Sequence, residues 1–408
     1  MFFSTGAEIV FIVAFLIIQL IVRKFFAQNT QRATLFIGNI LLLSTIINYT
    51  SLTLHIGLSL LVFLAMIWIS KANRNKGIIV ATGSILVIIG LFVLRNYPKP
   101  FGFDTFQIGS STDMIIQRLG ISYILFRNIQ SIIDTLKGKF KPSNPIDYIN
   151  FILFFPNFLA GPIDTFANFK RQFERKEGKT KRALIWPGIG RITMGFAKKY
   201  LLIPLFSMYA LSYEPLMETM PPQAAILLSI ICYSAYIYLD FSGYSDIAIG
   251  TGYVMGIRTP ENFKSPYLST NIATFWKNWH MTFSQFLRDL IFIPIIKLLN
   301  KTGLKSSRTL VTIIGYLLTF FICGIWHGDT INFVYWGLWH AFGLSVYKIW
   351  SSSRAHNNLH SSNNPIRKNA LTISGITLTF LFVSVGWLFF HYSGEGLTTV
   401  FNLLFGLK

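Results

Sequence analysis

Long apolar segments separated by short connections, several of them basic, are the feature that most restricts what this chain can fold into. The first segment, residues 7–22, is with Phe2 and Phe3 just long enough to cross the roughly 30 Å hydrocarbon core of a bilayer. Further apolar segments lie at residues 35–50, 54–70, 77–94, 186–210, 224–239, 310–326, 333–350 and 371–390. The pattern predicts an all-α, polytopic integral membrane protein with about eleven transmembrane helices.

Two other apolar segments contain charges or helix breakers. Residues 114–136 include Arg127 and Asp134, and residues 148–163 are interrupted by proline and glycine. Such groups are tolerated at membrane depth where they are buried in protein or line a wet cavity. We therefore expect interior or re-entrant helices here, and an amphipathic stretch at residues 272–299.

The composition excludes an ordinary soluble domain, because 52% of the residues are hydrophobic and only 13% are charged, against roughly a quarter charged in soluble domains. The formal net charge is +20, which in a soluble protein would suggest a nucleic-acid partner. Here the basic residues lie between apolar segments, so they indicate cytoplasmic loops facing anionic lipids, and no nucleic-acid partner is expected. Cys232 and Cys323 lack CxxC spacing, so neither a disulfide nor a metal site is predicted.

The charges between the first segments predict their orientation. Residues 23–32 and 71–76 contain Arg and Lys, whereas the intervening connection, residues 51–53, has none. By the positive-inside rule, the first and third connections face the cytoplasm. The N-terminus is therefore expected to be extracytoplasmic.

His280 lies in the polar part of an apolar and aromatic stretch. If residues 275–289 are helical, Trp276, His280, Ser284 and Arg288 recur every four residues along one face. That face combines an imidazole, a hydroxyl and a guanidinium, which suits a cavity lining. The alternative interpretation is an interfacial amphipathic helix that touches lipid headgroups.

His327 ends the apolar segment that begins near residue 310, with Gly324 and Gly328 close by in the sequence. Glycine allows backbone or substrate to approach closely. A histidine near its ordinary pKa can accept a proton from a substrate hydroxyl, as a general base does. The alternative is a hydrogen-bonded packing residue, and His340, in the middle of the next segment, is a weaker candidate.

Two motifs together carry a family resemblance: YLDFSGYSDIAIGTGYVMGIRTPENFKSPYLSTNIATFWKNWHMTFSQFLRDLIFIP, followed by GIWHG. The chain resembles the membrane-bound O-acyltransferase family over nearly its whole length. The resemblance implies that His327 is the catalytic histidine and His280 a second functional histidine. We expect substrate-channel or supporting roles for Trp276, Asn278, Trp279, Ser284, Arg288, Asp289 and Trp326.

Within that family the chain resembles a bacterial branch, which implies a place in the bacterial cytoplasmic (inner) membrane. GISYILFRNIQ, GPIDTF and MGIRTPENF look like the D-alanyltransferases of teichoic acids, whereas GIWHGDTINFVYWGLWHAFG and VSVGWLFF look like alginate-type O-acetyltransferases. The chain departs from the pattern at Thr165, where the D-alanyl branch commonly has arginine, and at Leu290, where an aromatic residue is usual. These departures bear on acceptor fit and partner docking, and the acyl group stays open.

The resemblance also implies a fold and a domain organisation. We expect a single membrane domain over residues 1–408, with helices arranged around a central funnel or tunnel. Its expected parts are N-terminal helices at 1–95, a catalytic core at 96–350, and a polar loop with a C-terminal helix at 351–408.

The resemblance implies transfer of a D-alanyl or acetyl group from a cytoplasmic thioester to a hydroxyl of the cell envelope. No covalently bound cofactor is expected. The expected partners are an acyl carrier protein or acyl-coenzyme A, anionic lipids, and a membrane-anchored or extracytoplasmic protein that takes part in acyl transfer. Basic residues at 170–182 or 297–308 could steer an acidic carrier protein, although retention at anionic lipid also explains them.

Two other functions remain possible from the sequence. Arg118, Arg127, Asp134 and Asp240 lie at predicted membrane depth, as in a transporter or flippase of an envelope precursor. A structural membrane scaffold is the third interpretation, but it gives no reason for His, Trp and Arg to gather around two segments.

Overall fold

The computed structural model describes residues 6–96, 111–175, 182–353 and 364–406, and all regular elements in these ranges are helical. The prediction of an all-α membrane protein is confirmed. The described residues form two compact units that interleave along the chain. Unit 1 comprises residues 1–196 and 244–260, and unit 2 comprises residues 197–243 and 261–408. The predicted division of one domain into three consecutive parts stays a prediction.

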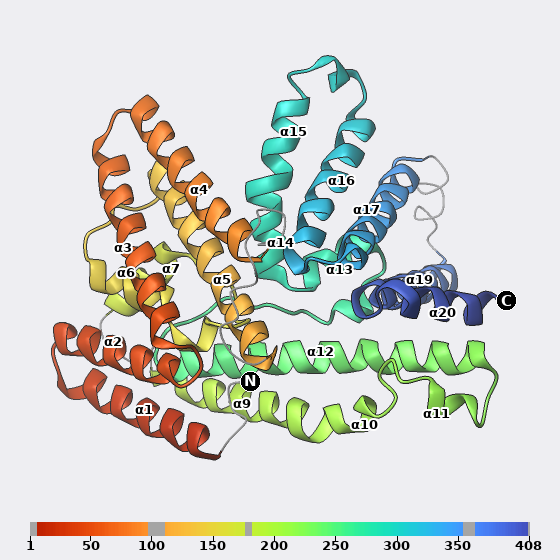
Figure 1. Cartoon of the computed structure of the whole chain (residues 1–408), viewed down its shortest axis with the longest axis horizontal. Coiled ribbons are helices and arrows are strands. Elements are labelled where there is room, and N and C mark those ends of the chain that lie inside the picture. The colour runs from red at the N-terminus through yellow and green to blue at the C-terminus, as the bar shows by residue number, and fades with distance from the viewer. Residues whose placement is uncertain (1–5, 97–110, 176–181, 354–363, 407–408) are drawn as a thin grey trace. The chain divides into compact units, whose positions relative to one another are not determined.

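Unit 1 contains most of the N-terminal helices. They are α1 (Gly6–Phe25), α2 (Gln28–Ser44), α3 (Tyr49–Lys71), α4 (Arg74–Asn96), α5 (Ser111–Leu136), α6 (Pro145–Ile152), the short 3₁₀ helix η2 (Phe155–Asn157), α7 (Phe166–Glu174), α9 (Ile185–Ala197) and the end of α12 (Pro222–Val254). Within this unit α3, α4 and α5 lie side by side (Figure 1).

Unit 2 contains the beginning of α12 and the helices around both predicted histidines. Before α12 it has the π-helix η3 (Lys198–Leu202), α10 (Ile203–Ser207) and α11 (Glu214–Met217); after it come η4 (Pro266–Leu268), α13 (Ile272–Asn278), α14 (Met281–Leu287), the π-helix η5 (Arg288–Phe292), α15 (Ile293–Leu299), η6 (Gly303–Ser306), α16 (Arg308–His327), α17 (Ile331–Ser351), α19 (Pro365–His391) and α20 (Gly394–Phe405).

Five stretches of described helix are long and apolar enough to cross a membrane: Tyr49–Lys71, Arg74–Val93, Pro222–Val254, Arg308–His327 and Pro365–His391. They make the chain a multi-pass membrane protein. The larger number of about eleven spans, and their arrangement around a funnel or tunnel, stay predictions.

The expected interruption after residue 148 is present in unit 1, and a buried arginine supports it. α6 ends at Ile152, and the next regular element is the single turn of η2. Arg127 of α5, fully buried, donates hydrogen bonds to the carbonyl oxygens of Phe151 at 3.1 Å, Ile152 at 2.8 Å and Asn157. The carbonyls at the end of a helix lack the usual N–H donor four residues on, and here only that of Phe151 receives a long backbone hydrogen bond, from Phe154 at 3.4 Å. Arg127 therefore replaces the missing backbone donors.

Two other charges that suggested a transporter also have ionic partners. Asp134 pairs with Lys139 at 2.8 Å, and Asp240 pairs with Lys199 at 2.5 Å. The side chain of Arg118 lies outside the described part of the structure. A local ion pair or hydrogen bond therefore explains each of the described charges. None of them has to be assigned to an ion pathway.

In unit 2, α16 and α17 lie side by side (Figure 1). A Cβ atom at Gly324 would collide with the carbonyl group of Phe333, and one at Gly337 would collide with that of Phe320. Small residues allow the backbones of two membrane helices to approach closely. This close packing places the C-terminal end of α16 against α17.

The expected continuous helix over residues 275–289 is wrong. α13 ends at Asn278, Trp279 is extended (φ −97°, ψ 127°), and His280 has a left-handed backbone (φ 44°, ψ 53°) before α14 begins. The backbone N–H of Met281 donates to the carbonyl of Asn262 at 2.8 Å instead of continuing the helical ladder. Trp276, His280, Ser284 and Arg288 consequently do not form one helical face.

Candidate active site

His280 lies in the turn between α13 and α14, held by the loop that precedes η4. Its Nδ1 atom is 3.0 Å from Oδ1 of Asn262. The same oxygen accepts hydrogen bonds from the hydroxyl of Thr282 at 2.9 Å and from its backbone N–H at 3.4 Å. A left-handed backbone is uncommon for a residue other than glycine and concentrates at functional sites.

The imidazole of His280 is enclosed by aromatic rings. The ring of Phe241 meets it edge to face at 4.7 Å, and the ring of Phe283 stacks on it at 4.9 Å. Burial lowers the pKa of His280 well below its ordinary value, and the nearby His327 lowers it further. His280 is therefore neutral at physiological pH.

His327, the last residue of α16, is half-buried and lies among aromatic rings. The ring centroids of Trp326, Trp336 and Phe390 are 4.5, 4.7 and 5.1 Å from that of His327. Phe283 lies 6.4 Å from His327 and 4.9 Å from His280, so both histidines border one aromatic ring. The two histidines predicted from the sequence thus belong to one cluster within unit 2.

This arrangement can perform proton transfer. A neutral imidazole is a base that can take a proton from a hydroxyl while the hydroxyl oxygen attacks a carbonyl carbon. The aromatic surroundings limit competing hydration of the reacting groups. His327, which keeps partial exposure, is the better placed of the two to meet a substrate.

Three of the predicted supporting tryptophans line this cluster. Trp326 contacts both His327 and Phe283, the latter at 4.6 Å. Trp279 packs against Phe263 at 5.1 Å and Trp387 at 5.3 Å, and it contacts Phe241, which also borders His280. Trp276 lies deeper.

The predicted polar supports are engaged elsewhere. Asn278 donates to the side-chain hydroxyl of Ser269 at 3.2 Å, and Ser284 donates to the backbone carbonyl of Trp279 at 3.0 Å, so both are engaged in local contacts. Arg288 is mostly exposed and pairs with its neighbour Asp289 at 2.8 Å. The structure brings neither member of this ion pair to His280.

Two further residues belong to the cluster and were not singled out as site residues from the sequence. Asn262 is completely buried and contacts His280, but in the sequence it is one polar residue in a polar loop. His340 of α17 is also completely buried and meets Trp276 and Trp336, each at 5.0 Å. Within the described part of the chain neither ring nitrogen of His340 has a hydrogen-bond partner. The feature of the sequence that pointed to His340 was its position in the middle of an apolar segment.

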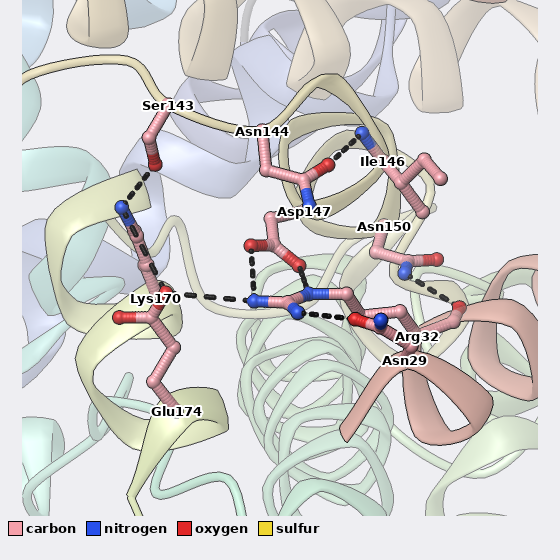
Figure 2. Close-up of polar contacts among 9 residues, drawn as sticks. All are labelled: Asn29, Arg32, Ser143, Asn144, Ile146, Asp147, Asn150, Lys170 and Glu174. Carbon is pink, nitrogen blue, oxygen red and sulfur yellow. Dashed lines mark hydrogen bonds and ion pairs between the residues drawn. The ribbon is translucent and has the colours of Figure 1, made fainter. Parts of the chain in front are cut away.

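Unit 1 has a separate polar network that fixes the ends of its short helices. Figure 2 shows Arg32 of α2 between Asp147 of α6 and Glu174 of α7. Arg32 binds both carboxylate oxygens of Asp147, at 2.7 and 3.1 Å, and a third donor reaches Asn29 at 3.0 Å. Glu174 in turn lies 3.8 Å from Lys170. These ion pairs hold α7 in a defined position relative to α2 and α6. They also fix the charged side of α7 that carries Lys170 and Glu174.

Beside this network is a basic groove of about 720 Å³. It is lined by Lys139, Phe140, Ala167, Lys170, Arg171, Gln172, Glu174 and Arg175. Four of these side chains are cationic and one is anionic, so the groove favours an anionic ligand. It includes the beginning of the basic stretch predicted at residues 170–182, of which residues 176–181 lie outside the described structure.

The chain is similar in sequence to several bacterial proteins named for acyl transfer. The chain is 32% identical over 327 residues to the teichoic acid D-alanyltransferase of Bacillus subtilis, covering 80% of each protein. It is 31% identical to the probable alginate O-acetylase AlgI of Pseudomonas fluorescens, over 79% of this chain but only 61% of that longer protein. The teichoic acid D-alanyltransferase of Streptococcus thermophilus is 27% identical, over 78% of this chain and 77% of the relative. A sequence model of the membrane-bound O-acyltransferase family matches residues 41–393, and the chain belongs to this family of acyl-transferring enzymes.

Proposed function

We propose that the protein transfers a small acyl group, D-alanyl or acetyl, from a cytoplasmic thioester to a hydroxyl of an envelope polymer such as teichoic acid or exopolysaccharide. The observation that carries the proposal is the cluster of His327 and His280 around Phe283, at the end of a candidate membrane span. The relatives named for D-alanyl and acetyl transfer support the substrate class.

His327 is the proposed general base. It takes the proton of the acceptor hydroxyl while the hydroxyl oxygen bonds to the thioester carbonyl carbon, and the carbonyl electron pair moves onto the carbonyl oxygen. When that pair re-forms the carbonyl, the carbon–sulfur bond breaks and the sulfur leaves with the bonding electrons. The sulfur then receives the proton from His327, so the products are an ester and a thiol.

His280 is the proposed second functional histidine. It is neutral and buried, and it shares the ring of Phe283 with His327. A neutral imidazole here can accept a hydrogen bond from the substrate and orient it. Trp326, Trp279 and Trp276 would form the apolar wall of the substrate channel.

The donor would be a phosphopantetheine-bearing acyl carrier protein or acyl-coenzyme A, both of which are anionic. The basic groove of Lys139, Lys170, Arg171 and Arg175 is the proposed surface for the carrier protein, since opposite charge steers association. A membrane-anchored or extracytoplasmic partner would receive the acyl group or present the acceptor. Anionic lipids would bind the remaining basic loops.

The protein would lie in the bacterial cytoplasmic membrane with its N-terminus outside. Cys232 and Cys323 are buried, so an introduced cysteine can report on each connection. Arg74→Cys, at the start of α4, should react with an impermeant thiol reagent only from the cytoplasmic side, and Thr50→Cys, at the start of α3, only from outside. The reverse pattern would contradict this orientation.

The transporter alternative is set aside because the family transfers acyl groups and because Arg127, Asp134 and Asp240 have structural partners. Purified protein in detergent tests the proposal, since no separate compartments exist there. We would supply acetyl-coenzyme A or D-alanyl carrier protein, add teichoic acid or exopolysaccharide, and measure ester formation and thiol release.

The test compares wild type with His327→Ala and a matched histidine variant. A well-placed general base contributes about 10²- to 10⁴-fold in rate, so His327→Ala should lose transfer by that factor while remaining folded. His391 also ends an apolar helix of unit 2, but its ring packs on Tyr233 at 5.4 Å and Tyr392 at 4.8 Å and not on the rings that surround His327. His391→Ala should retain transfer. Wild-type rates from His327→Ala would exclude His327 as the base.

A further inference from the structure

Asn262 contacts the turn of His280 through both its backbone and its side chain. Its carbonyl oxygen accepts the N–H of Met281 at 2.8 Å, which stops α13 from continuing into α14. Its side-chain oxygen lies 3.0 Å from Nδ1 of His280 and 2.9 Å from the hydroxyl of Thr282. One completely buried residue thereby fixes both the backbone turn and the imidazole ring.

The contacts decide which way the amide of Asn262 points. The backbone N–H of Thr282 can only donate, and it lies 3.4 Å from Oδ1, so the amide oxygen and not the NH₂ group must face this turn. An amide oxygen can only accept. The Nδ1 atom of His280, facing that oxygen, must therefore be the donor.

The tautomer of His280 follows from this geometry. A neutral imidazole has one protonated nitrogen and one nitrogen with a lone pair. Since Nδ1 carries the proton toward Asn262, the lone pair is on Nε2. The hydrogen bond made by one ring nitrogen commonly sets the chemistry available at the other.

The backbone of His280 gives a second, independent reason to assign it a special task. Its φ of 44° is left-handed, a conformation that costs free energy for a residue with a Cβ atom and persists only where surrounding contacts impose it. Here the imposing contact is the hydrogen bond from Met281 to Asn262. A role in packing alone would not require the ring and the backbone to be fixed by the same partner.

We propose that Asn262 is a positioning residue for acyl transfer, which holds His280 as its Nδ1–H tautomer so that Nε2 accepts a hydrogen bond from the substrate. This inference rests on the proposed function for its catalytic meaning. The tautomer itself is a property of the resting protein and can be measured without any substrate.

Nitrogen NMR of full-length protein labelled with ¹⁵N-histidine, in lipid bilayers near neutral pH, measures the tautomer. The His280 signals are those that His280→Ala removes. We expect a protonated Nδ1 and an unprotonated Nε2 in wild type and in Asn262→Asp, which keeps an acceptor. Asn262→Leu should shift the signals toward the Nε2–H form or a mixture. A wild-type protein with Nε2–H would overturn the proposal.

Activity provides the second readout. Asn262→Leu should lower kcat by at least about 10-fold with a smaller change in KM, because it misplaces a group without removing it, and Asn262→Asp should recover part of the loss. Asn271→Leu is the control, since Asn271 caps α13 by accepting the N–H of Thr274 at 2.8 Å. It should lower thermal stability and leave both tautomer and kcat unchanged. Equal losses of kcat in Asn262→Leu and Asn271→Leu would show that Asn262 has only a structural role.

The two hypotheses fail separately. If wild type transfers no acyl group but shows the Nδ1–H form, the proposed function is wrong and the assignment of Asn262 as the partner of His280 stands. If wild type is active and Asn262→Leu keeps its tautomer and its kcat, the role of Asn262 is wrong and the proposed function stands.

Discussion

Arg127 shows how a single charge can be required for folding inside a membrane protein. It donates to the carbonyl oxygens of Phe151, Ile152 and Asn157, where the chain leaves α6. In Arg127→Met the carbonyls of Ile152 and Asn157 lose this donor, at a cost of about 1–3 kcal/mol for each unsatisfied group. We expect a large fall in the unfolding temperature, or no folded protein. Arg74→Met removes an exposed arginine of the same unit and should change stability by no more than about 0.5 kcal/mol. Equal stability of the two variants would contradict the role of Arg127.

Asp164, beside the same turn, predicts a pH dependence of stability. Burial raises its pKa from 3.8 to about 6, although hydrogen bonds from Asn168 and Thr165 oppose the rise. Because the folded-state pKa is above the unfolded value, protonation favours the folded state. The contribution of Asp164 is fully present below about pH 4 and is lost as the pH rises through 6.

Unfolding temperatures at several pH values test this prediction. As the pH falls from 7.5 to 4, wild type should gain stability relative to Asp164→Asn, by at most about 3 kcal/mol. Asparagine cannot ionise, so the stability of the variant lacks the pH-dependent contribution of the Asp164 carboxyl group. A stability difference that does not change with pH would show that Asp164 titrates at its ordinary value.

The sequence identified His280 and His327 because ionisable residues in apolar segments require a reason, and the structure places them in one cluster. It did not identify Asn262, because a polar residue in a polar loop carries no such signal. The importance of Asn262 follows from a contact with a residue 18 positions away in the sequence. His340 gave a weak signal, since one buried histidine in an aromatic helix also fits packing.

At the scale of elements, the packing of α16 against α17 is the contact that sets the position of His327. A Cβ atom at Gly337 would collide with the backbone carbonyl of Phe320, which cannot move aside as a side chain could. Gly337→Ala should therefore separate the helices, cost about 1–3 kcal/mol or more, and reduce transfer.

Gly57 provides the matched control for this substitution. It also lies within an apolar helix, α3, but a Cβ atom there would meet nothing within 4 Å. Gly57→Ala should be neutral or stabilise the helix by up to about 1 kcal/mol. Thermal unfolding and the transfer assay, applied to both variants, separate the close contact from a general effect of replacing glycine. If Gly337→Ala and Gly57→Ala behaved identically, the close contact at Gly337 would not be the cause of the loss.

The segment around His280 explains why local patterns predicted one element incorrectly. Residues 275–289 have a helical spacing of apolar residues, which predicts a continuous helix. The structure interrupts it at Trp279 and His280 because the N–H of Met281 bonds to Asn262 in a distant loop. Periodicity contains no information about such a partner.

For the whole molecule, the apolar segments were sufficient to predict an all-helical membrane protein. They could not predict the two interleaved units, because residues 244–260 join the unit formed by residues 1–196 through contacts between distant parts of the chain. One example is the buried hydrogen bond of 2.9 Å from Arg23 to the carbonyl of Val254.

The charge of the whole molecule leads to a prediction about carrier binding. Arg171→Glu with Arg175→Glu reverses two charges of the basic groove, and we expect at least about 10-fold weaker binding of an acidic acyl carrier protein at low salt, because opposite charges steer association. Lys297→Glu with Lys301→Glu changes the same charge at the other basic stretch and serves as the comparison. Surface plasmon resonance on protein in lipid nanodiscs measures both. A loss confined to the second pair would move the carrier site there.

The central claim is acyl transfer to an envelope polymer that depends on His327. Mass spectrometry of envelope polymers would compare cells that have this protein, cells that lack it and cells that carry His327→Ala, with expression confirmed in each producing strain. The account predicts a D-alanyl or acetyl mass increment on a polymer only in cells with the intact protein, and the mass identifies the acyl group. The same increment in cells with His327→Ala, or no difference in any polymer, would contradict it.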